Sequence, residues 1–322
     1  MANGIKLVMD LQFVCAQPAT DYYVWQVEVM LNNFVKNGIN LNNVDIVCWK
    51  VNGVIPDNWQ TLANNYAARF FFYDDTRVSK HYISSIRPNI LKQHFTARRE
   101  LFNKAIFYHD CDIIFSKPID WSQYLAANDF NWYGSDTRWY IGHDYIISKG
   151  EDILEAMCNI VDIPKSLIEE NEHNAIGAQY ILKGITAEFW ENVERDCEKL
   201  FHDITQLNNQ KKIIDPNYHE LQIWCADMWA VLWNGWKMGY KTICSSDLEF
   251  SWGTSSEEDY FKMNIMHNAG VTNSGELFYK AEYINELPYG KELNVKPNTA
   301  SWHYYQAVKD AERNTKLNYY YA

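Results

Sequence analysis

The sequence predicts an α/β fold in which helices flank a mixed, mainly parallel sheet. In the first third of the chain, short stretches of branched and aromatic residues alternate with longer stretches whose apolar residues recur at helical spacing. Acidic residues lie at the ends of two of the short stretches, at 74 and 75 and at 110 and 112. In parallel sheets, ligands bind beyond the carboxyl ends of the strands, so these acids are the first candidates for a binding site.

The N-terminal part of the chain is expected to supply most of the parallel strands. The spacing of Val24, Val27 and Phe34 predicts a helix over 19–36, which Gly38 ends. Two more connections are predicted to be helical, one opened by Pro56 at 56–63 and one at 87–101. The strands between them are expected at 5–13, 44–49, 68–73 and 105–108. Strands that alternate with helices imply right-handed crossovers.

The second half of the chain is less regular. A strand is expected at 131–136, and a turn of small residues followed by a strand at 174–182. A charged amphipathic helix follows at 187–201, and an apolar helix at 221–233 carries a single acid, Asp227. Near the end, His267 stands beside a glycine turn. Because there is no repeat, low-complexity tract or clear linker, we expect one domain over 1–322.

Composition limits the class of protein. The net charge of −12 argues against a chain that coats nucleic acid through a broad basic face. The aromatic content of 16% allows a large core, and it also suits a groove that stacks on sugars or bases. Seven scattered cysteines without a C-x-x-C pair are typical of reduced thiols. No stretch has the character of a signal peptide or a membrane span, so a cytoplasmic location is expected.

Asp110 and Asp112 are the acids with the clearest chemical meaning. They follow the apolar stretch 105–108 and stand one residue apart. Two ionised carboxylates at the end of a buried strand are costly unless a cation compensates for them. Hard oxygen ligands at this spacing suit Mg²⁺ or Mn²⁺, which bind through one or two carboxylates plus a substrate phosphate. A strand-end turn without a metal is the alternative, because D-x-D alone is common.

Several motifs in order resemble one enzyme family. They are the D-x-D stretch at 108–114, Arg87-Pro88, the segments 177–182 and 226–229, and His267-Asn-Ala-Gly270. Over roughly residues 5–271 the chain resembles nucleotide-sugar-dependent glycosyltransferases of the Rossmann-like GT-A fold, of a bacteriophage or bacterial type. It lacks the Lys-Pro-Trp tail that follows the histidine motif in some retaining relatives. The resemblance implies a nucleotide-sugar-binding half over 1–120 and an acceptor-side half with a C-terminal extension over 121–322.

The resemblance also implies roles for residues. A Mn²⁺ or Mg²⁺ ion would be bound by Asp110, Asp112 and His267, and would neutralise the departing diphosphate of a donor, a UDP-sugar above all. Asp110 would also contact the ribose. Arg87 would contact the nucleotide or the sugar, with a plain surface cation as the alternative. The pair Asp74 and Asp75 would bind the base, with a solvated turn as the alternative.

Asp227 is the acid expected near the reaction centre. It lies among Trp224, Trp229 and Trp233, where an unpaired carboxylate would be expensive. It would accept from a sugar hydroxyl or serve as the catalytic base, and an internal N–H or Arg partner is the alternative. Two further residues could bind hydroxyls of the donor sugar, Gln179 and Asp136. The aromatic residues Trp252 and Trp302-His303 could form an acceptor wall or belong to the core.

The function predicted from these residues is metal-dependent glycosyl transfer. The acceptor could be a saccharide, a protein or, for a phage-type DNA glycosyltransferase, a hydroxymethylated base flipped from the helix. For DNA, phosphate contacts could come from Lys92, Arg98, Arg99, Lys104, Lys211 and Lys212. The same residues could also belong to a nucleotide-sugar hydrolase or to a non-catalytic nucleotide-sugar-binding protein. A viral enzyme would act in the host cytoplasm, and the oligomeric state is left open.

Overall fold

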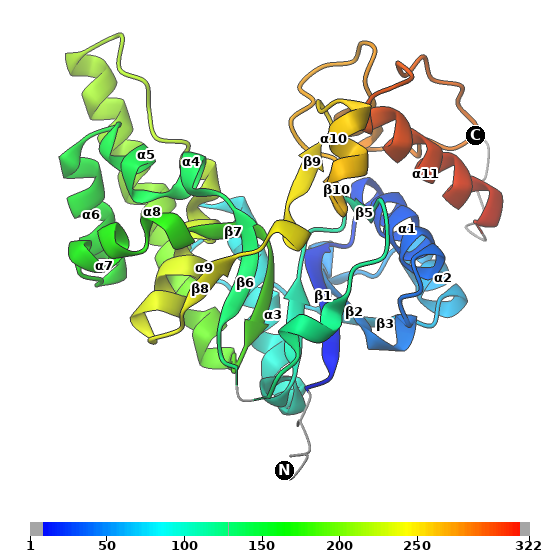
Figure 1. Cartoon of the computed structure of the whole chain (residues 1–322), viewed down its shortest axis with the longest axis horizontal. Coiled ribbons are helices and arrows are strands. Elements are labelled where there is room, and N and C mark those ends of the chain that lie inside the picture. The colour runs from blue at the N-terminus through cyan, green and yellow to red at the C-terminus, as the bar shows by residue number, and fades with distance from the viewer. Residues whose placement is uncertain (1–8, 128, 316–322) are drawn as a thin grey trace, which may run out of the picture. The chain divides into compact units, whose positions relative to one another are not determined.

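The computed structural model of the chain describes residues 9–127 and 129–315 (Figure 1). These residues form two compact units, and each is built from separate stretches of the chain. Unit 1 contains residues 9–10, 75–107, 124–127 and 129–245, and unit 2 contains 11–74, 108–123 and 246–315. Each unit therefore takes segments from both sides of residue 120, where the sequence suggested a division into halves.

Unit 2 begins with three parallel strands, β1 (Leu11–Pro18), β2 (Val44–Trp49) and β3 (Arg69–Tyr73), in the order β1-β2-β3. The connections are α1 (Asp21–Lys36) and α2 (Asp57–Asn65). The first strand runs over Leu11–Pro18 and not over the expected 5–13, of which 5–8 lie outside the described residues. The polar but buried side chains of Gln12 and Gln17 interrupt the apolar pattern, which is why the sequence misplaced this strand.

The rest of unit 2 carries the C-terminal part of the chain. A small sheet has the order β5 (Ile113–Phe115), β10 (Ile265–His267) and β9 (Phe250–Trp252). The helices α10 (Glu257–Lys262) and α11 (Ala300–Asn314) accompany it, and α11 packs beside α1 (Figure 1). The D-x-D stretch thus lies in a turn, between β4 (Ala105–Tyr108) and β5, which belong to different sheets.

Unit 1 contains most of β4 and the strands β6 (Trp132–Asp136), β7 (Ile176–Lys183) and β8 (Thr242–Cys244). In it β6 runs antiparallel to β7 and parallel to β8. Three packed helices are α3 (Ile86–Ala97), α8 (Ala187–Ile214) and α9 (Ala226–Lys237). Shorter helices are α4 (Arg138–Ile141), α5 (His143–Ile147), α6 (Glu151–Val161) and α7 (Lys165–Glu170).

Three predicted helices have clearly different boundaries in the structure. The helix expected over 87–101 is Ile86–Ala97, and a separate 3₁₀ segment, Arg99–Asn103, follows it. The amphipathic helix expected to end at 201 continues to Ile214, because Ile204 and Asn208 continue its buried face. The apolar helix expected to begin at 221 begins at Ala226, and a 3₁₀ turn, η7 (Ile223–Cys225), precedes it. Asp227 therefore stands in the first turn of α9 and not in the middle of a helix. A carboxylate in the first turn is favoured by the helix dipole.

The predicted fold class is confirmed. The hydrogen-bonded strand order of the larger sheet is β3-β2-β1-β4-β7-β6-β8. The pairs β1 with β2, β2 with β3 and β6 with β8 are parallel, while β6 and β7 are antiparallel, so the sheet is mixed and mainly parallel. Within the part of the chain that the structure describes, no helix has both the length and the apolar character needed to cross a bilayer.

Candidate functional site

The three predicted metal ligands come together in unit 2. Asp110 and Asp112 lie in the turn after β4, and His267 is the last residue of β10. Because β10 pairs antiparallel with β5, His267 stands opposite Ile113, the residue after Asp112. The next residue, Asn268, donates its backbone N–H to the carbonyl of Asp112 at 2.9 Å. The pairing of β10 with β5 thus places His267 beside Asp110 and Asp112, although it lies 155 residues after Asp112 in the sequence.

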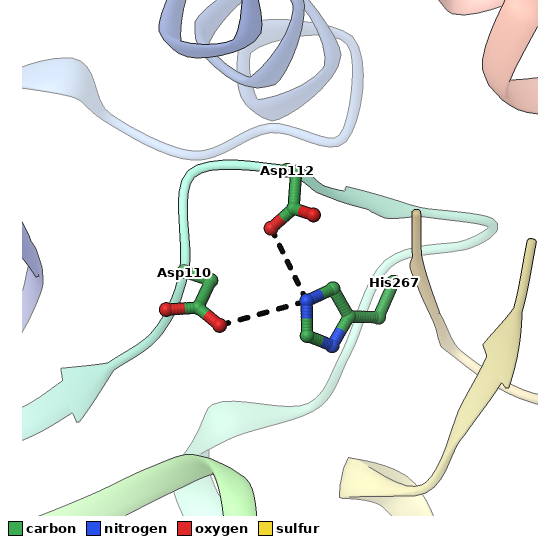
Figure 2. A group of neighbouring side chains, drawn as sticks. All are labelled: Asp110, Asp112 and His267. Carbon is green, nitrogen blue, oxygen red and sulfur yellow. Dashed lines mark ion pairs between the residues drawn. The ribbon is translucent and has the colours of Figure 1, made fainter. Parts of the chain in front are cut away.

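The geometry of this cluster fits a divalent cation (Figure 2). His267 Nε2 lies 3.2 Å from Asp112 Oδ1 and 3.5 Å from Asp110 Oδ2. One ligand atom from each residue lies within 4.8 Å of the others. Donor atoms around one Mg²⁺ ion, each about 2.1 Å from it, are at most about 4.2 Å apart. Only a small contraction is required, and carboxylate oxygens with a neutral imidazole suit Mg²⁺ or Mn²⁺.

Lys280 is a fourth member of this cluster, which the sequence analysis missed. It begins η9 (Lys280–Tyr283), and its Nζ forms an ion pair with Asp112 Oδ2. Burial alone would raise the pKa of the Asp112 carboxyl, but Lys280 and His267 lower it well below its usual range. Burial would lower the pKa of His267, yet the neighbouring Asp112 raises it above its usual value. No motif surrounds Lys280, so no local pattern in the sequence marks it.

Packing determines which nitrogen of His267 faces the carboxylates. The ring of Trp252 lies nearly parallel to the imidazole at 6.3 Å, and the ring of Phe250 lies at 5.5 Å. The Nδ1 atom is buried and makes no hydrogen bond to any described residue. The Nε2 atom is therefore the one presented to Asp110 and Asp112. A neutral imidazole ligates a metal through a lone pair of this kind.

His109 lies inside the motif but not in this cluster. Its ring packs against Phe13 at 6.3 Å and Phe34 at 5.5 Å. Burial lowers the pKa of His109 to about 4, so its imidazole is neutral at physiological pH. Its packing agrees with the alternation of side chains along an extended strand, which places His109 on the opposite face from its two acidic neighbours.

A second cluster, in unit 1, contains Asp227. Arg87 Nη2 lies 2.5 Å from Asp227 Oδ2. The hydroxyl of Tyr82 lies 2.7 Å from Asp227 Oδ1 and 2.6 Å from the carbonyl of Trp224. Asp227 therefore has hydrogen-bond donors from the chain itself, Arg87 and Tyr82. An internal partner of this kind is the alternative to a sugar hydroxyl that the sequence analysis left open. The arrangement fixes the carboxylate in one position, and its action on a sugar stays a prediction.

The segment that carries Tyr82 is attached firmly to α8. Glu198 is 4% exposed and accepts from Ser79 Oγ at 2.7 Å and from the backbone N–H of His81 at 2.9 Å. The ring of Tyr82 stacks on Phe201 at 4.8 Å. Because burial and the neighbouring Asp227 raise the pKa of Tyr82, its hydroxyl stays protonated and can donate. Sequence analysis missed Tyr82 and Glu198, since neither belongs to a recognisable motif.

The acids proposed to bind the base already have cationic partners. Asp74 pairs with Lys50 at 2.7 Å, and its side chain is 61% exposed. Burial would raise the pKa of Asp75, but hydrogen bonds from Arg77 and Lys80 lower it far below its usual range. A nucleotide would have to share these carboxylates with the lysines and the arginine. Their role in binding the base remains a prediction.

Gln179 and Asp136 lie on neighbouring strands of unit 1. Gln179 Nε2 donates to Ser135 Oγ at 2.9 Å. The preceding residue, Ala178, has a φ of 63°, and the pairing of β6 with β7 shifts register between Gly134 and Ser135. Left-handed backbone in a residue with a Cβ and a bulge of this kind both re-aim side chains, often at functional sites.

Arg138 is a further cation that the sequence analysis did not single out. Its Nη2 lies 2.6 Å from Asp136 Oδ2, and its Nη1 lies 2.7 Å from Nδ1 of His173.

Gly177 of β7 lies close to residues at the starts of α4 and α9. A Cβ at this position would lie 2.5 Å from Cε of Met228 and 2.8 Å from Oγ1 of Thr137. A larger residue at position 177 would displace the side chains of Thr137 and Met228.

Comparison with known proteins gives structural likeness only. No protein-family model and no curated protein matches the chain. Similar solved structures include the apo WbbM bifunctional glycosyltransferase, with a TM-score of 0.43 and 9% identity over 95% of this chain and 53% of WbbM. The galactosyltransferase LgtC, in complex with donor and acceptor sugar analogs, matches with a TM-score of 0.41 and 11% identity. This match covers 96% of this chain and 98% of LgtC. The apo mouse xyloside xylosyltransferase 1 matches with a TM-score of 0.39 and 10% identity. This match covers 80% of this chain and 97% of the xylosyltransferase. The chain thus spans about half of WbbM.

Proposed function

We propose that this chain is a metal-dependent glycosyltransferase that moves a sugar from a nucleotide-sugar donor, a UDP-sugar above all, to an acceptor. The observation that carries the proposal is the cluster of Asp110, Asp112 and His267. Its ligand atoms lie within 4.8 Å of one another, at the end of a strand of the larger sheet. That edge is where α/β folds bind nucleotides.

The proposed chemistry is the departure of a nucleoside diphosphate from the anomeric carbon of the sugar. A divalent cation in this cluster would offset the negative charge that develops on the leaving diphosphate. Asp110 and Asp112 would supply oxygen ligands, and His267 would supply Nε2. Lys280 binds Asp112 Oδ2, so Asp112 Oδ1 is left facing His267 at 3.2 Å. The lysine therefore favours a one-oxygen contact between Asp112 and the ion.

The residues of unit 1 would bind and orient the sugars. Asp227, fixed by Arg87 and Tyr82, would accept from a sugar hydroxyl or take the proton of the attacking acceptor. Gln179 is fully buried on a re-aimed strand and would bind a donor-sugar hydroxyl, as would Asp136. Buried polar groups in one fixed geometry are the arrangement that transition-state stabilisation requires, because they need no reorganisation during the reaction.

The basic residues considered for DNA do not favour that acceptor. The ion pairs are Lys92 with Glu194, Arg98 with Glu100, Lys104 with Asp10, Lys211 with Asp152 and Lys212 with Glu220. Five of the six candidates are thus neutralised by carboxylates of the same chain. Counterion release by free lysines and arginines is the main source of affinity for DNA phosphates. An uncharged acceptor fits this surface better.

The experiment that tests the proposal is a panel of nucleotide sugars assayed for thermal stabilisation with and without Mn²⁺. A ligand at 100 times its Kd adds about 2.7 kcal/mol of stability, which is easily measured as a rise in melting temperature. We expect stabilisation by at least one donor to depend on Mn²⁺ and to disappear in Asp112→Asn. The exposed Asp120, in the same segment, gives the matched control Asp120→Asn.

Product analysis then separates transfer from hydrolysis and from simple binding. A transferase releases the nucleoside diphosphate faster when the right acceptor is added, whereas a hydrolase releases free sugar at a rate that acceptors do not change. A non-catalytic binding protein would be stabilised by the donor without turnover. If no nucleotide sugar stabilises the protein in a Mn²⁺-dependent way, the proposal is wrong.

A further inference from the structure

Lys280 brings a positive charge into the candidate metal cluster. Its Nζ forms an ion pair with Asp112 Oδ2, and its side chain is 27% exposed, against 6% for that of Asp112. Burial would lower the pKa of Lys280, but the neighbouring Asp112 raises it above its usual value. The ammonium therefore keeps its charge throughout the neutral range. A lysine on a metal-ligating carboxylate neutralises the same charge that a divalent cation would use.

The backbone that carries Lys280 is held on both sides. Phe278 is buried, and its backbone N–H donates to Ser301 Oγ at 2.6 Å. Tyr283 is also buried, and its ring stacks on that of Phe278 at 5.5 Å. Both belong to a hydrophobic cluster of unit 2. The four-carbon stem of the lysine is therefore the movable part, and it can redirect the ammonium while the backbone stays in place.

The charges of the cluster leave little attraction for a divalent cation alone. Asp110 and Asp112 contribute two carboxylates, and the ammonium of Lys280 offsets one of them. A metal ion on Asp112 Oδ1 would lie close to the ammonium on Oδ2. Like charges repel strongly over such a distance, because a partly buried pair is poorly screened by water and salt. Lys280 should therefore lower the affinity of the cluster for the ion.

The lysine can find a second partner in the proposed donor. The side chains of Asp110 and Lys280 are 35% and 27% exposed, so a ligand from solvent can reach both. The diphosphate of a nucleotide sugar is an anion with several acceptor oxygens, which can bind a metal ion and an ammonium at the same time. A diphosphate in the cluster would thus reverse the shortage of negative charge.

We propose that Lys280 competes electrostatically with the metal ion at Asp112 until the donor binds, and that the donor diphosphate relieves this competition by giving the ammonium a second anionic partner. Metal and donor then bind together, and the ion alone binds weakly. This inference rests on the proposed glycosyl transfer and adds a regulation of its metal site. By linkage, the factor by which the donor tightens metal binding equals the factor by which the metal tightens donor binding.

The first test compares the affinity of the full chain for Mn²⁺ alone in wild type and Lys280→Gln, by calorimetric titration. Glutamine removes the charge but can still donate to Asp112, so the variant should bind Mn²⁺ at least about tenfold more tightly. Lys280→Met should show the same gain without the hydrogen bond, whereas Lys280→Arg keeps the charge and should bind as wild type does. Lys296→Gln removes an exposed lysine that pairs with Glu276, and should change nothing.

The second test measures Mn²⁺ binding with and without UDP. In wild type UDP should strengthen Mn²⁺ binding, and this coupling factor should be at least about fivefold smaller in Lys280→Gln. The complex that Mn²⁺ and UDP form in solution is the same for both proteins, so the ratio of their coupling factors isolates the lysine. Equal coupling factors would overturn the link to the donor.

The outcomes separate this inference from the proposed function. Equal affinity of wild type and Lys280→Gln for Mn²⁺, or weaker binding by the variant, would overturn the competition. Neither result would affect glycosyl transfer, which the panel of nucleotide sugars tests separately. If Lys280→Gln binds Mn²⁺ more tightly but no nucleotide sugar is turned over, the lysine controls the metal site and glycosyl transfer is wrong.

Discussion

Two acidic clusters of this chain are alike in burial but differ in what surrounds them. Asp112 is 5% exposed and Asp227 is 8% exposed, and each forms an ion pair with a basic residue of its own unit. Around Asp112 stand a second carboxylate and an imidazole whose ligand atoms face one another. Around Asp227 stand a guanidinium and a phenol, both of which only donate hydrogen bonds to it.

The difference separates a candidate metal site from an ion pair that is already balanced. A cation is attracted where acceptors outnumber donors and point toward one place, as they do at Asp110, Asp112 and His267. Asp227 has two strong donors, one on each oxygen, so its charge is already balanced. The first cluster adds a second carboxylate, Asp110, to the ion pair of Asp112 with Lys280, so it has the ligand types that a further cation could use. In the second cluster, the Asp227 carboxylate is already fixed by Arg87 and Tyr82. A substrate hydroxyl would have to share this carboxylate with them or displace one of them.

The largest effect is expected from removal of Asp112. Asp112→Asn should abolish Mn²⁺ binding and reduce glycosyl transfer by at least about a thousandfold, because the charge opposite the leaving group is lost. It should also lower stability, since the partly buried Lys280 then loses its ion pair with Asp112. Calorimetric titration with Mn²⁺ and a melting curve measure the two effects, with Asp120→Asn as control. Full activity of the variant in Mn²⁺ would refute the metal site.

Asp227→Asn tests whether the second cluster acts on a substrate. The change keeps an oxygen that accepts from Tyr82 but removes the charge opposite Arg87. If Asp227 works on the reacting sugar, kcat should fall by about 10² while binding of the nucleotide is unchanged. If Asp227 only stabilises α9, the melting temperature should fall and kcat of the folded protein should stay near wild type. Steady-state kinetics with a melting curve decide between the two.

His267→Ala should have a smaller effect than loss of Asp112. It should weaken Mn²⁺ binding by about ten- to a hundredfold, because two oxygen ligands remain. Asp112 raises the pKa of His267, so protons compete with the metal up to a higher pH than an isolated histidine would allow. Metal affinity in wild type should therefore rise with pH through this range. A Mn²⁺ binding constant that is the same in His267→Ala as in wild type at every pH would contradict the assignment.

The sequence marked the first cluster well because its residue types are distinctive at short range. D-x-D after an apolar strand, and His267 beside a glycine turn, can each be recognised within a few residues. What completes the cluster is not local. Lys280 is 168 residues from Asp112, and a single lysine carries no pattern. The same reasoning explains Tyr82, which is 145 residues from Asp227.

The fold shows the same limit. The strand at 44–49 was predicted to the residue because its apolar run is uninterrupted apart from Asp45, and β1 was misplaced because two buried glutamines break its run. Their burial is possible only because the folded chain supplies partners, such as the carbonyl of Val47 for the amide of Gln17. Tertiary hydrogen bonds of this kind cannot be read from the local pattern that sequence analysis uses.

Tyr82→Phe examines the connection within the second cluster. It removes the hydroxyl that donates to Asp227 and lies by the carbonyl of Trp224, and leaves the ring stacked on Phe201. We expect a loss of about 1 kcal/mol of stability, the net worth of a hydrogen bond, and up to about tenfold lower kcat if Asp227 then moves. Tyr66→Phe, which removes a buried hydroxyl in unit 2, should affect stability only. Equal kinetics in both variants would show that Tyr82 does not position Asp227.

The smallest effect concerns a third buried carboxylate, which extends the comparison. Glu28 is fully buried and accepts from the hydroxyls of Tyr66 at 3.2 Å, Tyr289 at 2.9 Å and Thr315 at 2.7 Å. Unlike Asp112 and Asp227, it forms no ion pair with a described residue. Burial raises the pKa of Glu28 above its usual 4.5, and the three hydroxyls offset this only in part. A carboxylate without a cation should thus be the one whose charge destabilises the fold.

The sign of the pH dependence follows from that raised pKa. Below pH 4.5 Glu28 is protonated in both the folded and the unfolded chain, so its charge costs nothing. As pH rises through the folded pKa, the native state has to accommodate a buried charge, and stability is lost. Glu28→Gln keeps the shape and stays neutral, so it should raise the melting temperature by about 2–4 °C at about pH 7. That gain should vanish near pH 4, because wild type is then neutral as well. Melting curves at both pH values measure it, and an equal shift under acidic and neutral conditions would show that the charge of Glu28 is not the cause.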